Sequence, residues 1–144
     1  MPISLNATFA GDAPTDPEFE HPKGASIARL VREAVGPEGW VADELDNWRD
    51  VGWSFICSRG QAKLEFVISL MRQNDWIVQV APLAVPGLLG RVLGKQASAS
   101  PVDVFDLAKV VQEVLSRYPE YQGFRWRWDG PPSPGSDHEP IPAA

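Results

Sequence analysis

Four acidic residues form the densest cluster of ionisable side chains in the middle of the chain: Asp43, Glu44, Asp46 and Asp50. Carboxylate oxygens are ligands that Mg²⁺ and Ca²⁺ prefer, but this spacing does not match an EF-hand loop and no phosphate-binding glycine turn accompanies it. A docking surface for a basic partner is a second interpretation. A solvated sheet edge without a function is the third, and it needs the fewest assumptions. We predict no metal and no cofactor, and we take docking as the functional hypothesis for the cluster.

Few other side chains are suited to nucleophilic or acid–base chemistry. The two histidines, His21 and His138, lie in proline-rich acidic segments near the ends of the sequence, whereas a catalytic histidine must be held by a packed shell. The single cysteine, Cys57, alternates with Trp53 and Phe55, and a buried free cysteine behaves as a small hydrophobic residue. We therefore predict no catalytic residue and no enzymatic activity.

An apolar, glycine-rich segment, Pro82–Lys95, precedes the second helix. It is longer than an ordinary connection, and long loops with apolar residues are commonly functional or fold over a core edge. Its glycines match neither a P-loop nor a dinucleotide fingerprint. We expect an amphipathic turn packed on the sheet. The alternative is a surface for a partner or a second copy, formed by Leu88, Leu89 and Arg91.

Aromatic residues recur at alternating positions of the expected strands. Alternation places Arg125 and Arg127 on the face opposite the neighbouring tryptophans, where they are either solvated or paired with Glu65 across an antiparallel neighbour. A stacking platform for bases or sugars is the alternative to a core role for the tryptophans. The four expected to face the helices are Trp53, Trp76, Trp126 and Trp128.

Periodicity indicates which elements position these residues. Apolar residues spaced by three and four predict a helix over 24–35, and alternation predicts a strand over 2–9. Alternation over 53–58, 63–70 and 76–81, with short turns between, predicts an antiparallel meander. Trp40–Asp46 is a weaker candidate for an additional edge strand.

The remaining elements follow the long loop. Ser100-Pro101-Val102-Asp103 is typical of a capped helix start, and Pro119 ends that helix. The last strand is expected at 124–128. The order β-α-β-β-β-β-α-β favours an α+β fold, with an antiparallel meander sheet of four to six strands and two amphipathic helices on one face.

Length, charge and composition restrict the class of protein. The 144 residues predict one α+β domain over 1–130, with a proline- and acid-rich connector at 11–22 and a proline-rich, flexible tail at 131–144. The net charge of −6 arises mainly from residues 1–22 and 129–144, which carry seven acids and no base. This argues against nucleic-acid binding. We expect no secretory signal, no membrane contact and, from the lone cysteine, a cytoplasmic protein.

Three functional hypotheses remain. The first is a non-enzymatic protein-interaction domain, analogous in size, charge and architecture to bacterial immunity proteins, adaptors or secretion chaperones, whose edge from Glu38 to Asp50 meets a basic surface. The second is a small-molecule-binding domain or minor enzyme with a site between the 82–100 loop and the sheet end, using Trp40, Trp48, Arg91 and Lys95. The third is a structural homodimer that associates through an edge strand or the loop.

Overall fold

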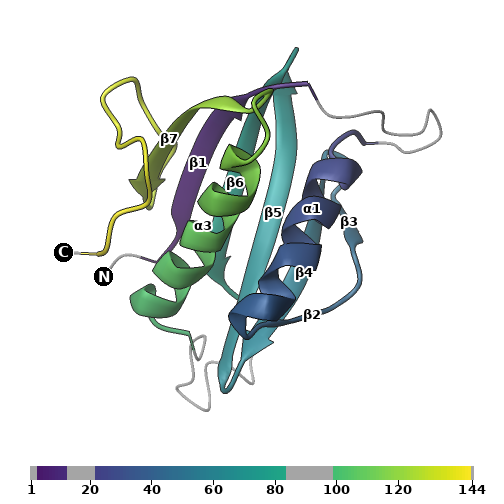
Figure 1. Cartoon of the computed structure of the whole chain (residues 1–144), viewed down its shortest axis with the longest axis vertical. Helices are drawn as coiled ribbons and strands as arrows, with labels where there is room; N and C mark the ends of the chain where they lie inside the picture. Colours follow the sequence, from purple (N-terminus) through teal and green to yellow (C-terminus); the bar gives the residue numbers. More distant parts are fainter. Residues whose placement is uncertain (1–2, 13–21, 84–98, 144) are drawn as a thin grey trace.

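The computed structural model describes residues 3–12, 22–83 and 99–143 and has the α+β class predicted from periodicity (Figure 1). One antiparallel sheet carries two α-helices, α1 (Ala25–Val35) and α3 (Pro101–Ser116). The sheet has seven strands in the described residues, which is more than the predicted four to six. They are β1 (Leu5–Ala10), β2 (Val41–Ala42), β3 (Asp46–Trp48), β4 (Gly52–Arg59), β5 (Ala62–Arg72), β6 (Asp75–Pro82) and β7 (Gln122–Trp128).

The extra strand arises where a single edge strand was expected. One strand was predicted over Trp40–Asp46, but the chain forms β2 within this segment and begins a second strand, β3, at its last residue, and both pair with β4. Val41 and Ala42 pair near the Arg59 end of β4, and Asp46–Trp48 pair near its Gly52 end. A short helical turn, Gly36–Glu38, leads from α1 into this edge.

The strand order is β2-β4-β5-β6-β1-β7. β3 also pairs with β4, on the same edge as β2 but farther along the strand. The predicted meander is present as β4-β5-β6. β1 lies between β6 and β7 and pairs antiparallel with both, so the first and last strands are neighbours. The suggested pairing of Arg125 or Arg127 with Glu65 is therefore wrong, because β1 and β6 separate β7 from β5.

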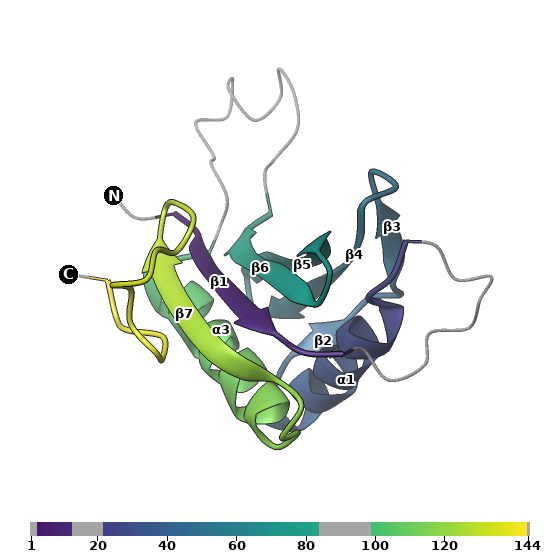
Figure 2. The same cartoon turned by 90° about the horizontal axis from the view of Figure 1, so that it is seen from above.

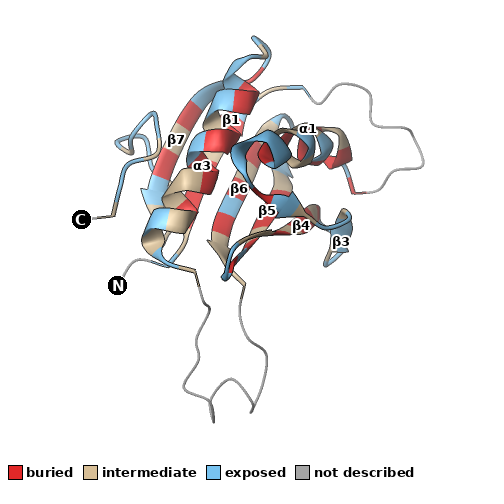
Figure 3. Ribbon diagram, turned by 60° about the horizontal axis from the view of Figure 1, so that its bottom comes forward, coloured by how far each residue is buried: buried red, intermediate tan, exposed pale blue. Residues whose placement is uncertain are grey.

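Both helices cover the same face of the sheet and contact each other (Figure 2). Alternate residues of the strands point toward them, which gives the banding of buried and exposed residues along β6 and β7 in Figure 3. Leu5, Phe66 and Val80 on the strands and Ile27 and Leu107 on the helices are completely buried. The core thus lies between the helices and one sheet face.

Tryptophans anchor this core, as their spacing predicts. Trp76 and Trp126 are almost fully buried, and Trp53 and Trp128 are half-buried at its margin. Each buried indole nitrogen has an acceptor: Trp76 Nε1 donates to the carbonyl of Gly11 at 2.8 Å, and Trp126 Nε1 donates to Gln112 Oε1 at 2.7 Å. Burial of large aromatic area without an unpaired donor makes these positions strongly stabilising.

The C-terminal segment runs along the outer edge of β7. Trp126 N–H donates to the carbonyl of Asp137 at 2.7 Å, and the Trp128 indole donates to the carbonyl of Ile141 at 2.9 Å. The boundary at residue 130 and the flexibility of 131–144 stay predictions. The contacts nevertheless give this segment anchors that its proline-rich composition did not indicate.

Candidate partner-binding edge

The four acidic residues singled out in the sequence lie on the sheet edge formed by β2, β3 and the turn that follows. Asp43, Glu44, Asp46 and Asp50 are all exposed. In the strand order, β2 and β3 are outermost on their side, next to β4. We call residues 38–50 the acidic edge. It carries five acids, the fifth being Glu38, and one base, Arg49.

Local hydrogen bonds hold the acidic edge in place. The backbone N–H of Asp43 donates to the carbonyl of Ile56 at 2.8 Å. The backbone carbonyl of Asp43 accepts from Arg32 Nε of α1 at 2.5 Å. At the other end, Arg49 and Asp50 both have positive φ, 54° and 59°, and Val51 N–H closes the turn on the Trp48 carbonyl. Two consecutive residues with positive φ are characteristic of the tight turns that join antiparallel strands.

The acids are spread along the edge and do not converge. Among residues 3–12, 22–83 and 99–143, no group of three or more histidine, cysteine, aspartate or glutamate side chains could hold a metal ion. Oxygen coordination of Mg²⁺ or Ca²⁺ needs several ligands around one point, and the described acids of this edge do not supply them.

Cys57 lies behind the acidic edge, on the helix-facing side of β4. Its side chain is fully buried. Burial and, to a smaller extent, nearby Asp43 together raise the pKa of the thiol to about 12, although Arg59 opposes the shift. The thiol is therefore protonated at neutral pH, and the environment is unsuited to a thiolate nucleophile.

A small cleft at the Arg59 end of β4 was not anticipated from the sequence. It has a volume of about 160 Å³ and is lined by side chains that include Glu38, Trp40 and Lys109. This is below the 300–1,000 Å³ typical of small-molecule sites. Trp48 pairs with Gly52 at the opposite end of β4, so the structure does not bring Trp40 and Trp48 to one site.

Arg59 fills one side of this cleft and connects β4 to α3. Its guanidinium lies 4.3 Å from the ring centroid of Trp40, and it pairs with Asp103 at 3.1 Å and Asp106 at 2.9 Å. Asp103 and Asp106 are three residues apart in the first turns of α3, which places them on one side of the helix. The sequence contained this spacing but no signal that Arg59 would meet it.

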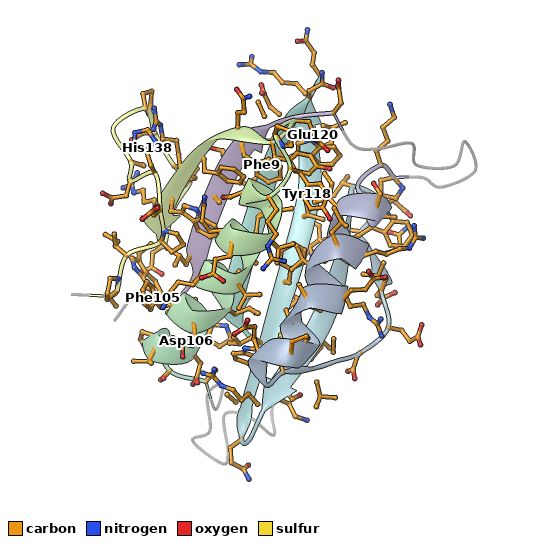
Figure 4. The ribbon with its side chains drawn as sticks, in the orientation of Figure 1. Phe9, Phe105, Asp106, Tyr118, Glu120 and His138 are labelled. Carbon is orange, nitrogen blue, oxygen red and sulfur yellow. The ribbon has the colours of Figure 1, made fainter. Side chains whose placement is uncertain are left out.

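The remaining predicted residues separate into two groups. Leu88, Leu89 and Arg91 of the apolar loop lie outside the described residues, as do Lys95 and His21. His138 is exposed, and its ring contacts the guanidinium of Arg125 beside β7 (Figure 4). It has no neighbour among the acids of the acidic edge, which is on the opposite side of the sheet.

Comparison with known proteins found no matching family model, no matching curated protein and no matching solved structure. Within the described residues, no helix is long and apolar enough to span a membrane.

Proposed function

We propose that this protein is a non-enzymatic interaction domain that binds a basic surface of another protein through its acidic edge. The observation that carries the proposal is the concentration of exposed carboxylates, Asp43, Glu44, Asp46 and Asp50, on an outermost part of the sheet. A binding role of the kind performed by immunity proteins or adaptors, in the cytoplasm, is the form we favour, by analogy of size, charge and architecture.

The two sides of the sheet differ in a way that supports this choice. On the β7 side, the chain's own segment 131–143 lies along the strand and pairs at Trp126 with Asp137. On the β4 side, the outermost strands are short, interrupted and lined with acids. Charges on an edge discourage unselective strand pairing, and they also steer a basic partner toward that edge at a salt-dependent rate.

Neutralising the acidic edge tests the proposal. The triple variant Asp43→Asn, Glu44→Gln, Asp50→Asn removes three charges while keeping side-chain size, and asparagine tolerates the positive φ at position 50. Wild-type and variant proteins are immobilised, proteins retained from a native lysate are identified, and the affinity of each is measured by titration calorimetry at low and high salt. We expect a wild-type partner whose affinity falls by about tenfold or more in the variant and also falls with salt.

The matched control removes three exposed acids away from the acidic edge: Glu120→Gln, Asp137→Asn and Glu139→Gln. Glu120 lies at the far end of α3 (Figure 4). The control should bind like wild type. An equal loss of affinity in both variants would mean that only net charge matters. The proposed role would be refuted if the edge variant kept its full affinity, or if wild type retained no specific partner.

A further inference from the structure

On the sheet face opposite the helices, two rows of side chains have uncharged residues between an acidic or aromatic residue at one end and an arginine at the other. Since α1 and α3 lie together on one face (Figure 2), the alternate strand residues point away from them. The paired registers place these residues in rows that cross the sheet. One row is Asp46, Ser54, Val67, Gln79, Asn6 and Arg127, from β3 to β7.

The adjacent row repeats the pattern with an aromatic residue in place of the acid. It runs Trp48, Gly52, Ser69, Ile77, Thr8 and Arg125. Each row therefore ends in an arginine on β7, and each begins with a group that attracts a guanidinium: a carboxylate in one row, an indole ring in the other.

Further contacts define the charge at each side. Glu65 of β5 lies near Asp46: burial raises the pKa of Glu65, Arg49 lowers it and Asp46 raises it, with a net increase. Arg49 lies 4.9 Å from the ring centroid of Trp48, so this indole already accepts a guanidinium. On β7, Arg127 is exposed and Arg125 is half-buried.

We propose that two copies of this chain associate through these faces about a two-fold axis that runs parallel to the strands, between β5 and β6. Such an axis reverses the order of strands and leaves the rows in register. Asp46 then faces Arg127 of the partner subunit, and Trp48 faces Arg125 of the partner subunit. Both contacts occur twice, as a self-complementary interface requires.

Charge selects this axis over the alternative. A two-fold axis perpendicular to the strands would place β7 over β7 and bring four arginines together, which is unfavourable. Sheets that pack face to face are about 10 Å apart with nearly aligned strands, and long side chains at the rows' ends span that gap.

The centre of the face contributes less new contact area than its sides. Asn6, Ser54 and Val67 are already nearly inaccessible, at 6%, 6% and 5% exposure. Ile56 and Ile77 are half-buried and Gln79 is exposed. The charged and aromatic row ends should therefore decide whether the two copies associate, which makes charge exchange a sharp test.

The experiment uses sedimentation velocity of the full chain over a range of concentrations and salt. Two variants carry exchanged charges: Arg125→Glu with Arg127→Glu, and Asp46→Arg. We expect wild type to form a dimer that weakens with salt. Each variant alone should dimerise about tenfold or more weakly, because like charges then face each other, and an equimolar mixture should restore a dimer. The control is Lys109→Glu on α3 with Arg117→Glu directly after it, which should dimerise like wild type.

A wild-type protein that stays monomeric at low salt, or variants that dimerise as well alone as wild type, would overturn the proposal. So would a mixture of the two variants that fails to associate, provided that circular dichroism shows both to be folded. Asp46 belongs to both surfaces, but the proposed function is tested at Asp43, Glu44 and Asp50 and the dimer at Asp46, Arg125 and Arg127. Failure of one leaves the other intact.

Discussion

At the scale of single residues, the environment of each reactive group decides what it can do. Cys57 is the chain's one thiol, and the charge of Asp43 raises its pKa in the same direction as burial does. Arg59 is half-exposed and shared between Asp103 and Asp106, so its pairing ties two elements together and is partly screened by water. Neither environment favours proton transfer or nucleophilic attack.

The thiol of Cys57 should be unreactive in the folded protein. A group with a pKa near 12 stays protonated at pH 8, and burial also blocks access to a reagent. We expect labelling by an aromatic disulfide at pH 8 to be slow in buffer and to accelerate steeply across the unfolding transition in urea. A rate in buffer equal to that of unfolded protein would show that the thiol is accessible.

At the scale of elements, the capping residues at the start of α3 also connect this helix to β4. Ser100 and Asp103 form a reciprocal capping box: the Asp103 carboxylate accepts from Ser100 N–H at 3.0 Å, and the Ser100 hydroxyl accepts from Asp103 N–H. Burial alone would raise the pKa of Asp103, but hydrogen bonds from Ser100 and Arg59 outweigh it and lower the pKa. The cap and the Arg59 pair thus reinforce each other.

Removing the capping hydroxyl should weaken the whole fold. Ser100→Ala leaves a helix-terminal N–H without its acceptor, and we expect it to lower the free energy of unfolding by about 1 kcal/mol. Urea denaturation followed by tryptophan fluorescence measures the change. Ser116→Ala, in the last turn of the same helix, is the control and should have a smaller effect. Equal losses in the two variants would mean that the cap contributes nothing specific.

At the scale of the whole molecule, the first described residues meet the end of β7 through Asp129. Its Oδ1 accepts from the backbone N–H groups of Ile3 at 2.6 Å and Ser4 at 3.0 Å, and Asp129 N–H donates to the Ser4 carbonyl. These hydrogen bonds from Ile3 and then Ser4 lower the pKa of the carboxyl group. The contact holds β1 beside β7. Both rows of side chains on the sheet face opposite the helices depend on this pairing.

This contact should make stability depend on pH in acid. Because the pKa of Asp129 is lower in the folded state, its contribution is present above about pH 4, where the unfolded group is ionised. The contribution is lost as pH falls through the lower, folded-state pKa. The Asp129→Asn variant should therefore be less stable than wild type at pH 6. As the pH falls from 5 to 2, the stability of the variant should decrease less than that of wild type. Thermal unfolding across that range measures this, and Glu33→Gln on α1, which changes net charge equally, should follow wild type.

The sequence alone determined the two helices, the meander and the first and last strands, because each of these elements depends on local pattern. Alternation around Phe55, Phe66 and Val78 identified the meander, whose register follows from short turns. The density of acidic residues around Asp43 also indicated a solvated or partner-binding edge. The interruption between Val41–Ala42 and Asp46–Trp48 was not visible in the pattern, since a short edge segment has too few alternations to show a break.

Only the tertiary structure decided which strands are neighbours across the sheet. β1 has no short turn to either of its partners, so its place between β6 and β7 follows from long-range packing of Leu5, Ala7 and Phe9 against the core. That placement aligned Asp46 with Arg127 across five intervening pairings, and it separated Arg127 from Glu65. A strand's periodicity specifies which face is buried, but the choice of partner depends on contacts between residues far apart in the chain.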